Sequence, residues 1–301
     1  MSSHKIELYS PEYFKYSFIG GILACAPTHG AVTAIDTIKC RLQVDSHLYK
    51  SNLDGFKKII SQDGFGALYT GGAATFLGYG LQGFGKYGFY ELFKYKYGEF
   101  LGKENAEKYR TSLYLASSAS AEFIADILLC PFEAVKVRQQ TTLDFKQTKS
   151  FVATWKEIAQ HGGLYSGLGP LWFRQIPYTM VKFTTFEKIV EYIYDYFHLQ
   201  KNKMNKFQQA SVSFAGGFIA GVMCAIVSNP ADVMVSKINH NKLASESTSQ
   251  AVKREYAKIG FKGLWSGLPM RIVMISSLTS FQWLIFDSFK ISVGLPSTGG
   301  H

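Results

Sequence analysis

Three carboxylates recur along a stretch of sequence that is otherwise mostly apolar. Glu122, Asp126 and Glu133 are separated by 4 and 7 residues, and at about 100° per residue these offsets place them in one narrow stripe of a helix. A stripe of carboxylates facing lipid would be costly, so we expect it to face water or polar groups. Partly buried carboxylates can exchange protons near neutral pH. Glu122 and Asp126 are therefore candidates for proton binding.

A thiol, an imidazole and a carboxylate share one face of another apolar stretch. Cys25, His29 and Asp36 are also separated by 4 and 7 residues, so the same helical arithmetic applies. His29 titrates near neutral pH and is the third candidate for proton coupling. Cys25 and His29 lie one helical turn apart, a spacing that could hold a soft ion such as Cu(I).

Two lysines and a glutamine occupy equivalent positions in three segments of the chain. They are Lys86, Lys182 and Gln282, each five residues before an acidic residue, namely Glu91, Glu187 and Asp287. Two ammonium groups and one amide at the same depth suit an anionic ligand. Gln82 lies one turn from Lys86 and would add a neutral donor.

Acid–base pairs also recur three times along the chain. They are Asp36 with Lys39 and Glu133 with Lys136, each three residues apart, and Asp232 with Lys237, five residues apart. Acid and base three residues apart are neighbours on a helix, so each acid can reach the base of the next copy and the three pairs can close a ring. Such a ring would act as a gate, because it must break for a solute to pass. Gln43, Gln140 and Asn239 follow at a shared offset and could brace the pairs by hydrogen bonds.

The elements that must position these residues are membrane spans. The 301 residues are 47% hydrophobic and 18% charged, and the ranges 16–35, 67–85 and 207–231 contain no Lys, Arg, Asp or Glu. A transmembrane helix needs about 20 apolar residues. The net charge of +10 is scattered without a nucleic-acid motif, so anionic lipid or an anionic substrate explains it better than nucleic acid.

The markers repeat with a period of about 100 residues. Tyr69-Thr70-Gly71, Tyr165-Ser166-Gly167 and Trp265-Ser266-Gly267 are spaced by 96 and 100 residues, as are Tyr90-Glu91, Phe186-Glu187 and Phe286-Asp287. We expect one all-α membrane domain over 1–301, with repeats at 11–105, 106–203 and 204–295. Six spans are expected at 11–44, 72–100, 108–141, 170–197, 206–239 and 268–293. The spans must be helical because lipid offers no hydrogen bonds to the backbone. The connectors hold short helical patterns, so amphipathic helices are expected at 53–60, 151–159 and 251–259.

These residues resemble the mitochondrial carrier family, whose motif is Pro-x-Asp/Glu-x-x-Lys/Arg-x-Lys/Arg in three tandem repeats. Residues 131–140 carry that motif in full, and the match covers essentially the whole chain. Within the family, the segments 27–30, 121–127, 174–183 and 278–282 look like those of the phosphate carriers.

The resemblance implies a six-helix barrel that opens alternately to the two sides of the mitochondrial inner membrane. It implies import of inorganic phosphate with a proton, or in exchange for hydroxide, by a monomer without a cofactor. Arg174 and Gln175 stand at the level where carriers of this family contact substrate, and the Arg fork suits phosphate oxygens. Glu91, Lys94, Glu187, Asp287 and Lys290 match the family's outer gate. The turns at Gly71, Gly167 and Gly267 resemble its cardiolipin sites.

The sequence departs from the family pattern at three positions. Ala34 stands where the first motif has Pro, Val235 stands where the third has a base, and Val190 replaces the base of the outer motif in the second repeat. The gates should therefore be less regular than in the family. No cleaved presequence is expected, since Glu7 and Glu12 interrupt the basic region that such a segment needs.

Two other functions remain to be weighed. The first keeps the fold but carries copper or a copper–anion complex, alone or besides phosphate, through Cys25 and His29. The second is a membrane enzyme, which would need a nucleophile with its base or a closed metal site. The sequence offers neither, so we expect a transporter and not an enzyme.

Overall fold

The computed structural model describes residues 6–45, 47–240 and 248–299. Six long helices dominate it: α1 (Pro11–Val44), α3 (Gly72–Leu101), α5 (Arg110–Thr141), α7 (Leu168–Tyr196), α8 (Lys206–His240) and α10 (Leu268–Ser292). Four of them, α1, α5, α8 and α10, are apolar and long enough to cross a membrane by composition alone. α3 and α7, with 30 and 29 residues, are of comparable length and carry Lys86 and Lys182 within them.

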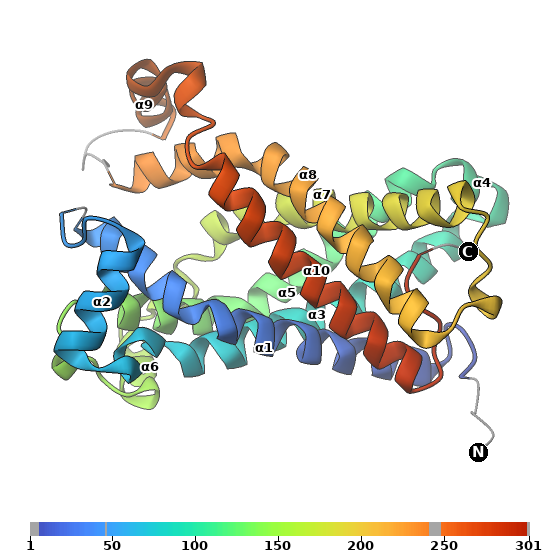
Figure 1. Ribbon diagram of the computed structural model, residues 1–301, viewed down its shortest axis with the longest axis horizontal. Coiled ribbons are helices and arrows are strands. Elements are labelled where there is room, and N and C mark those ends of the chain that lie inside the picture. Colours follow the sequence, from blue (N-terminus) through green and yellow to red (C-terminus); the bar gives the residue numbers. More distant parts are fainter. Residues whose placement is uncertain (1–5, 46, 241–247, 300–301) are drawn as a thin grey trace.

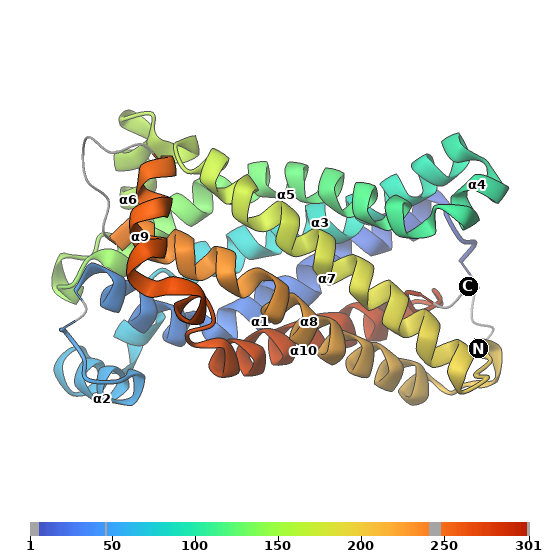
Figure 2. The same ribbon diagram turned by 90° about the horizontal axis from the view of Figure 1, so that it is seen from above.

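The long helices form a closed ring. Each packs against the next along the chain, and α10 returns to pack against α1. In Figures 1 and 2 the long helices run roughly along the long axis of the molecule. The all-α fold with six long helices confirms the expectation from the sequence.

The two ends of the ring differ. At one end, called here the connector end, lie the short helices α2 (Asn52–Asp63), α6 (Phe151–Gln160) and α9 (Thr248–Gly263) (Figure 1). At the other, the terminal end, lie both chain termini and α4 (Lys103–Lys108) (Figure 2). Single 3₁₀ turns, η1 (Phe65–Tyr69), η2 (Phe145–Gln147), η3 (Gly163–Tyr165) and η4 (Lys201–Lys203), complete the links.

Local sequence sets where these elements begin. Ser10 caps α1 by accepting a bond from the Tyr13 amide, and Pro11 follows at the first turn. Ser51 and Ser150 cap α2 and α6 in the same way. Gly71 and Gly267 adopt left-handed backbone angles, both with φ of 76°, immediately before α3 and α10.

Small residues allow the long helices to cross closely. A Cβ atom on Gly83 of α3 would lie 2.1 Å from the carbonyl oxygen of Gly21 on α1. A Cβ atom on Gly221 of α8 would lie 2.4 Å from Cα of Ser276 on α10. Close approach through small residues is the usual means of packing helices in lipid, where the hydrophobic effect does not draw helices together.

An aromatic cluster fills the ring towards the terminal end. Tyr87 of α3, Phe183 and Phe186 of α7, and Trp283 and Phe286 of α10 are all almost fully buried. The rings of Phe186 and Trp283 stack with their centroids 3.6 Å apart. The helices therefore meet on the axis at this level, and the interior is closed there.

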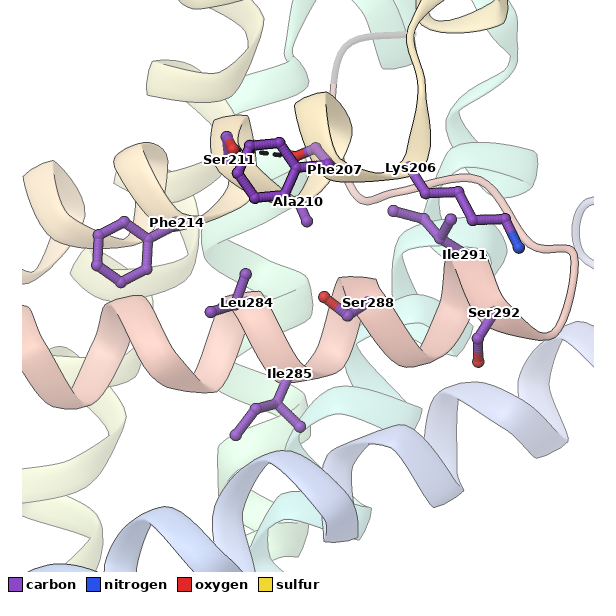
Figure 3. Close-up of a pocket in the computed structure, with 10 residues that line it drawn as sticks. All are labelled: Lys206, Phe207, Ala210, Ser211, Phe214, Leu284, Ile285, Ser288, Ile291 and Ser292. Carbon is purple, nitrogen blue, oxygen red and sulfur yellow. Dashed lines mark hydrogen bonds between the residues drawn. The ribbon is translucent and has the colours of Figure 1, made fainter.

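The outward surface is largely apolar and includes a groove between α8 and α10. Figure 3 shows this groove, which has a volume of about 730 Å³. Phe207 and Phe214 from α8 face Leu284 from α10 across it, and Lys206 stands at its rim. Such a surface fits lipid rather than water.

Candidate functional site

A polar cavity of about 200 Å³ lies inside the ring. Its lining contains every residue expected to bind the anion: Gln82, Lys86, Arg174, Gln175, Lys182 and Gln282. These side chains come from α3, α7 and α10, the second helix of each repeat. A water molecule occupies about 30 Å³ in the liquid, so the cavity has room for a small hydrated ion.

Lys182 is placed to receive an anion. Its Nζ donates a hydrogen bond to Oε1 of Gln282, exactly one repeat away, and the side chain is only 3% exposed. Among the described residues, no carboxylate lies within ion-pair distance of Lys182 Nζ. The charge of a buried ammonium that contacts only a neutral amide is not compensated, so it can pair with an anionic ligand.

Arg174 contributes a second cation to the cavity. Its side chain is 43% exposed and its closest acid is Glu133, with 3.9 Å between Nη2 and Oε1. That distance is too long for a hydrogen bond. The guanidinium therefore retains donors that could bind a tetrahedral oxyanion.

A cluster of carboxylates lies directly behind the cavity wall. Glu122 and Asp126 of α5 are both fully buried. The amide of Gln82 donates to Glu122 Oε1 over 2.8 Å and to Asp126 Oδ1 over 3.3 Å. Lys86 Nζ lies 3.1 Å from Glu122 Oε2. One ammonium thus faces two carboxylates, so the cluster is neutral only when the pair also holds one proton.

His29 and Cys25 occupy different surroundings on α1. His29 lines the cavity and stacks on Tyr79, with ring centroids 3.8 Å apart. Cys25 is 3% exposed and belongs to the aromatic cluster. Among the residues that the structure describes, no group of three or more His, Cys, Asp or Glu could hold a metal ion.

The acid–base ring at the connector end is partly formed. Lys136 Nζ lies 3.4 Å from Asp36 and 3.6 Å from Glu133. Asp232 pairs with Arg271 instead of Lys39, and Lys39 contacts the sulfur of Met274. Lys237 is exposed. Of the three braces, Gln140 donates to Thr37 Oγ1 over 3.2 Å, whereas the side chains of Gln43 and Asn239 lie outside the described part of the chain.

The charged positions at the terminal end are buried, and four of them form ion pairs. Lys94 Nζ lies 2.8 Å from Glu187 and 3.1 Å from Glu91. Lys290 Nζ lies 3.9 Å from Glu91. Asp287 is fully buried. The terminal end is closed by these contacts and by the aromatic cluster beneath them.

The glycine turns stand at helix starts, as expected. Gly71, Gly167 and Gly267 are the residues immediately before α3, α7 and α10. The free amides of a helix N-terminus and the helix dipole attract anions. All three turns lie at the connector end.

Comparison with known proteins explains the threefold pattern. The family model described as mitochondrial carrier protein matches three times, at residues 10–100, 107–197 and 207–295. The chain belongs to the mitochondrial carrier family. Membership makes it a membrane carrier that crosses the bilayer several times.

Relatives of this carrier cover nearly its whole length. A protein of Schizosaccharomyces pombe named "Probable mitochondrial phosphate carrier protein" is 55% identical over 98% of this chain and 95% of its own. The "Phosphate carrier protein, mitochondrial" of Caenorhabditis elegans is 49% identical over 97% of this chain and 85% of its own. "Solute carrier family 25 member 3" of Bos taurus is 48% identical over 95% of this chain and 78% of its own.

Three polar lining residues of the carrier cavity were not among the site residues expected from the sequence. Arg271, Tyr79 and Tyr178 all line it. Arg271 donates to Asp232 and, over 2.9 Å, to Ser228 Oγ. A usable signal existed, because Arg271 is the one charged residue in the range 268–286, and an isolated charge in a span is a functional candidate.

Proposed function

We propose that this carrier moves inorganic phosphate across the mitochondrial inner membrane into the matrix, together with a proton or in exchange for hydroxide. The observation that carries the proposal is the cavity on the ring axis, where Arg174 and Lys182 are cationic donors without a hydrogen bond to a carboxylate among the described residues. The names of the relatives agree with this cargo.

The charge balance of the lining favours an anion. Four cations line the cavity, Lys86, Arg174, Lys182 and Arg271, against two carboxylates, Asp36 and Asp232. A phosphate ion accepts several charge-assisted hydrogen bonds at once. The surplus of two positive charges therefore matches a singly or doubly charged phosphate.

The carboxylate cluster suggests how a proton is coupled. Lys86 is shared between the cavity and Glu122. A proton on the pair Glu122 and Asp126 would weaken the hold of Glu122 on Lys86, and the ammonium could then turn to phosphate. Anion and proton would thus bind together, and neither would bind well alone. His29 lines the same cavity and is the remaining candidate for carrying the proton.

The two ends of the ring act as alternating gates in this proposal. We assign the connector end to the matrix side and the terminal end to the intermembrane space. The structure then corresponds to a state closed outside, with only one of three cross-repeat pairs formed at the matrix gate, Asp36 with Lys136. The amides before α3, α7 and α10 would bind cardiolipin headgroups at the matrix surface.

Uptake of labelled phosphate into liposomes holding the purified protein tests the cargo. We expect uptake to require an imposed pH gradient and Arg174→Ala to abolish it. Lys156→Ala, which removes an exposed cation on α6, is the matched control and should transport normally. Near-normal uptake by Arg174→Ala would contradict the site. Copper uptake, lost in Cys25→Ala while phosphate uptake persists, would support the alternative cargo.

A further inference from the structure

The third acid at the terminal end lacks the partner that the repeat predicts. Lys94 follows Glu91 by three residues and pairs with Glu187, and Lys290 follows Asp287 by three and pairs with Glu91. By the same register Asp287 should meet the residue three after Glu187. That residue is Val190, which has no charge. A buried carboxylate without a partner is strongly destabilising.

The chain beyond α10 supplies what Val190 lacks. Both the amide and the hydroxyl of Thr298 donate to Asp287 Oδ1, over 2.9 Å and 2.8 Å. Lys290 Nζ donates to the same hydroxyl over 3.2 Å. Ser213 of α8 donates to the other oxygen of Asp287. Thr298 therefore links the acid and the base of the third repeat.

The same segment fills the space beside Val190. A Cβ atom on Gly299 would lie 2.7 Å from Cγ1 of Val190 and 3.3 Å from Oε2 of Glu187. Gly299 also has a φ of 74°, which L-residues rarely adopt. Leu295, Ser297 and Thr298 are each at most 3% exposed. These residues are thus packed within the gate and not spread over its surface.

Lys201, in the link between α7 and α8, holds the segment from the other side. Its Nζ donates to the carbonyl oxygen of Ser297 over 2.9 Å and to that of Gly299. Burial, and then the neighbouring charge of Lys290, lower the pKa of Lys201 to about 8. Lys201 is half-buried, and its two hydrogen bonds tie the segment after α10 to the link between the second and third repeats.

We propose that residues 295–299 form the third closing contact of the gate at the terminal end, in place of the base that Val190 replaces. The segment bridges α7 and α10 while this end is closed, and Thr298 must leave Asp287 when it opens. The proposal rests on the alternating access proposed above, but not on the identity of the cargo.

Cys25 provides a reporter for opening of this gate. It lies in the aromatic cluster, one helical turn towards the terminal end from the cavity residue His29. A membrane-impermeant maleimide added outside liposomes should therefore reach it only when the terminal end opens. The reporter protein keeps Cys25 and carries Cys40→Ser, Cys130→Ala and Cys224→Ala, and its Cys25→Ala version gives the background.

Two changes weaken the contact to different extents. Ending the chain after Val293 removes all Thr298 and Gly299 contacts, and we expect initial labelling of Cys25 to rise about tenfold or more, as the loss of hydrogen bonds to a buried charge implies. Thr298→Val keeps the shape and the amide but removes the hydroxyl, and should give a smaller rise. Thr298→Ser and the exposed Ser292→Ala are controls that should label like the parent.

A repair variant makes the test specific. In the shortened chain, Val190→Lys places a base beside Asp287, and we expect it to return labelling towards the parent rate. Unchanged labelling in both the shortened chain and Thr298→Val would overturn the proposal, and Thr298→Val alone decides if the shortened chain does not fold. Phosphate uptake, measured in parallel, separates the two proposals. If the parent protein transports phosphate but loss of residues 295–299 does not change labelling, only the gate proposal is contradicted. If labelling increases but no phosphate is taken up, only the proposed cargo is contradicted.

Discussion

Two carboxylates bridged by a single amide, with one ammonium beside them, are the smallest unit in the coupling proposed for this carrier. Gln82 contacts both Glu122 and Asp126, and it also lines the cavity. A ligand that binds Gln82 or Lys86 would therefore weaken the contacts of these residues with Glu122 and Asp126. In the proposed coupling, this unit links the anion to the proton directly.

Neutralising one acid should separate the two ions. In Asp126→Asn the remaining Glu122 and Lys86 balance each other, so the cluster no longer needs a proton. We expect phosphate exchange between equal pH values to persist while acceleration by an imposed pH gradient falls at least about tenfold. Gradient-dependent uptake at the parent rate would contradict the coupling. Gln147→Asn, an exposed amide change on η2, serves as the control.

The cavity residues could be foreseen where the repeat constrains them. Lys86, Lys182 and Gln282 share one offset from the acids that follow, so symmetry alone placed them on one level. Arg271 could not be found by that counting, because the matching offset of 16 residues before Glu187 gives Leu171. Thr298 lies after the last repeat, where no pattern points to a contact with Asp287.

At the scale of the helices, the crossing of α1 and α3 depends on two glycines. The carbonyl of Gly21 occupies the space that a side chain on Gly83 would need. The period of the sequence predicted the helices and their order, but not this crossing, since glycines spread along α3 look alike in a single sequence. Only the packing distinguishes those that touch a neighbour from those that do not.

Adding one methyl group to α3 should therefore have different effects on stability at two sites. Gly83→Ala forces α1 and α3 apart, and we expect it to lower the free energy of unfolding by about 1–3 kcal/mol or more. Gly98→Ala meets nothing within 4 Å and should be neutral or slightly stabilising, because Ala favours helix over Gly. Thermal unfolding in detergent measures both, and equal behaviour would contradict the crossing.

The link between α7 and α8 makes a prediction about pH. The pKa of Lys201 falls from 10.5 to about 8 in the folded carrier, chiefly by burial. Lys290 and Lys94 oppose its charge, whereas Asp287 and Glu187 favour it, and the ring of Tyr194 lies 5.4 Å from Nζ. Below pH 8 Lys201 is charged in both the folded and the unfolded state, so folding desolvates a charge. Between pH 8 and 10.5 Lys201 is protonated in the unfolded chain but neutral in the folded carrier.

Stability of the parent should consequently rise relative to Lys201→Met as pH increases through that window. The unfolded state binds more protons there, so the slope of unfolding free energy against pH is positive. Melting temperatures of the two proteins at pH 7 and pH 9.5 give the comparison. If the melting temperature of the parent fell relative to that of Lys201→Met at the higher pH, the assignment would be contradicted.

At the scale of the molecule, the two ends of the ring are unequal. At the terminal end Lys94, Glu91, Glu187 and Lys290 form ion pairs, Asp287 is held by hydrogen bonds, and an aromatic cluster lies below them. Among the side chains that the structure describes, the connector end has one cross-repeat pair, whereas Glu133 and Asp232 contact Lys136 and Arg271 of their own repeats. The threefold symmetry of the sequence is therefore not a symmetry of the gates, and the departures at Val190 and Val235 foreshadow this.

Weakening the two ends should move the carrier in opposite directions. Glu187→Gln loosens the contact with Lys94 and should increase labelling of Cys25 from outside. Lys136→Gln loosens the contact with Asp36 at the other end and should decrease it, since the state open outside requires that end to close. Movement of both variants in the same direction would contradict alternating access.

The contact between α1 and α10 has a consequence for how the chain is made. Gln282 of α10 lies 3.5 Å from the hydroxyl of Thr28 on α1, and these residues are 254 positions apart. Closing so long a loop is slow, and it cannot begin before the last helix has been synthesised. Until then Lys86, Glu122 and Asp126 have no complete wall around them and would face the interior of the bilayer at a high cost. A nascent carrier of this kind therefore needs its charged residues shielded from the bilayer interior until the final helix has been synthesised.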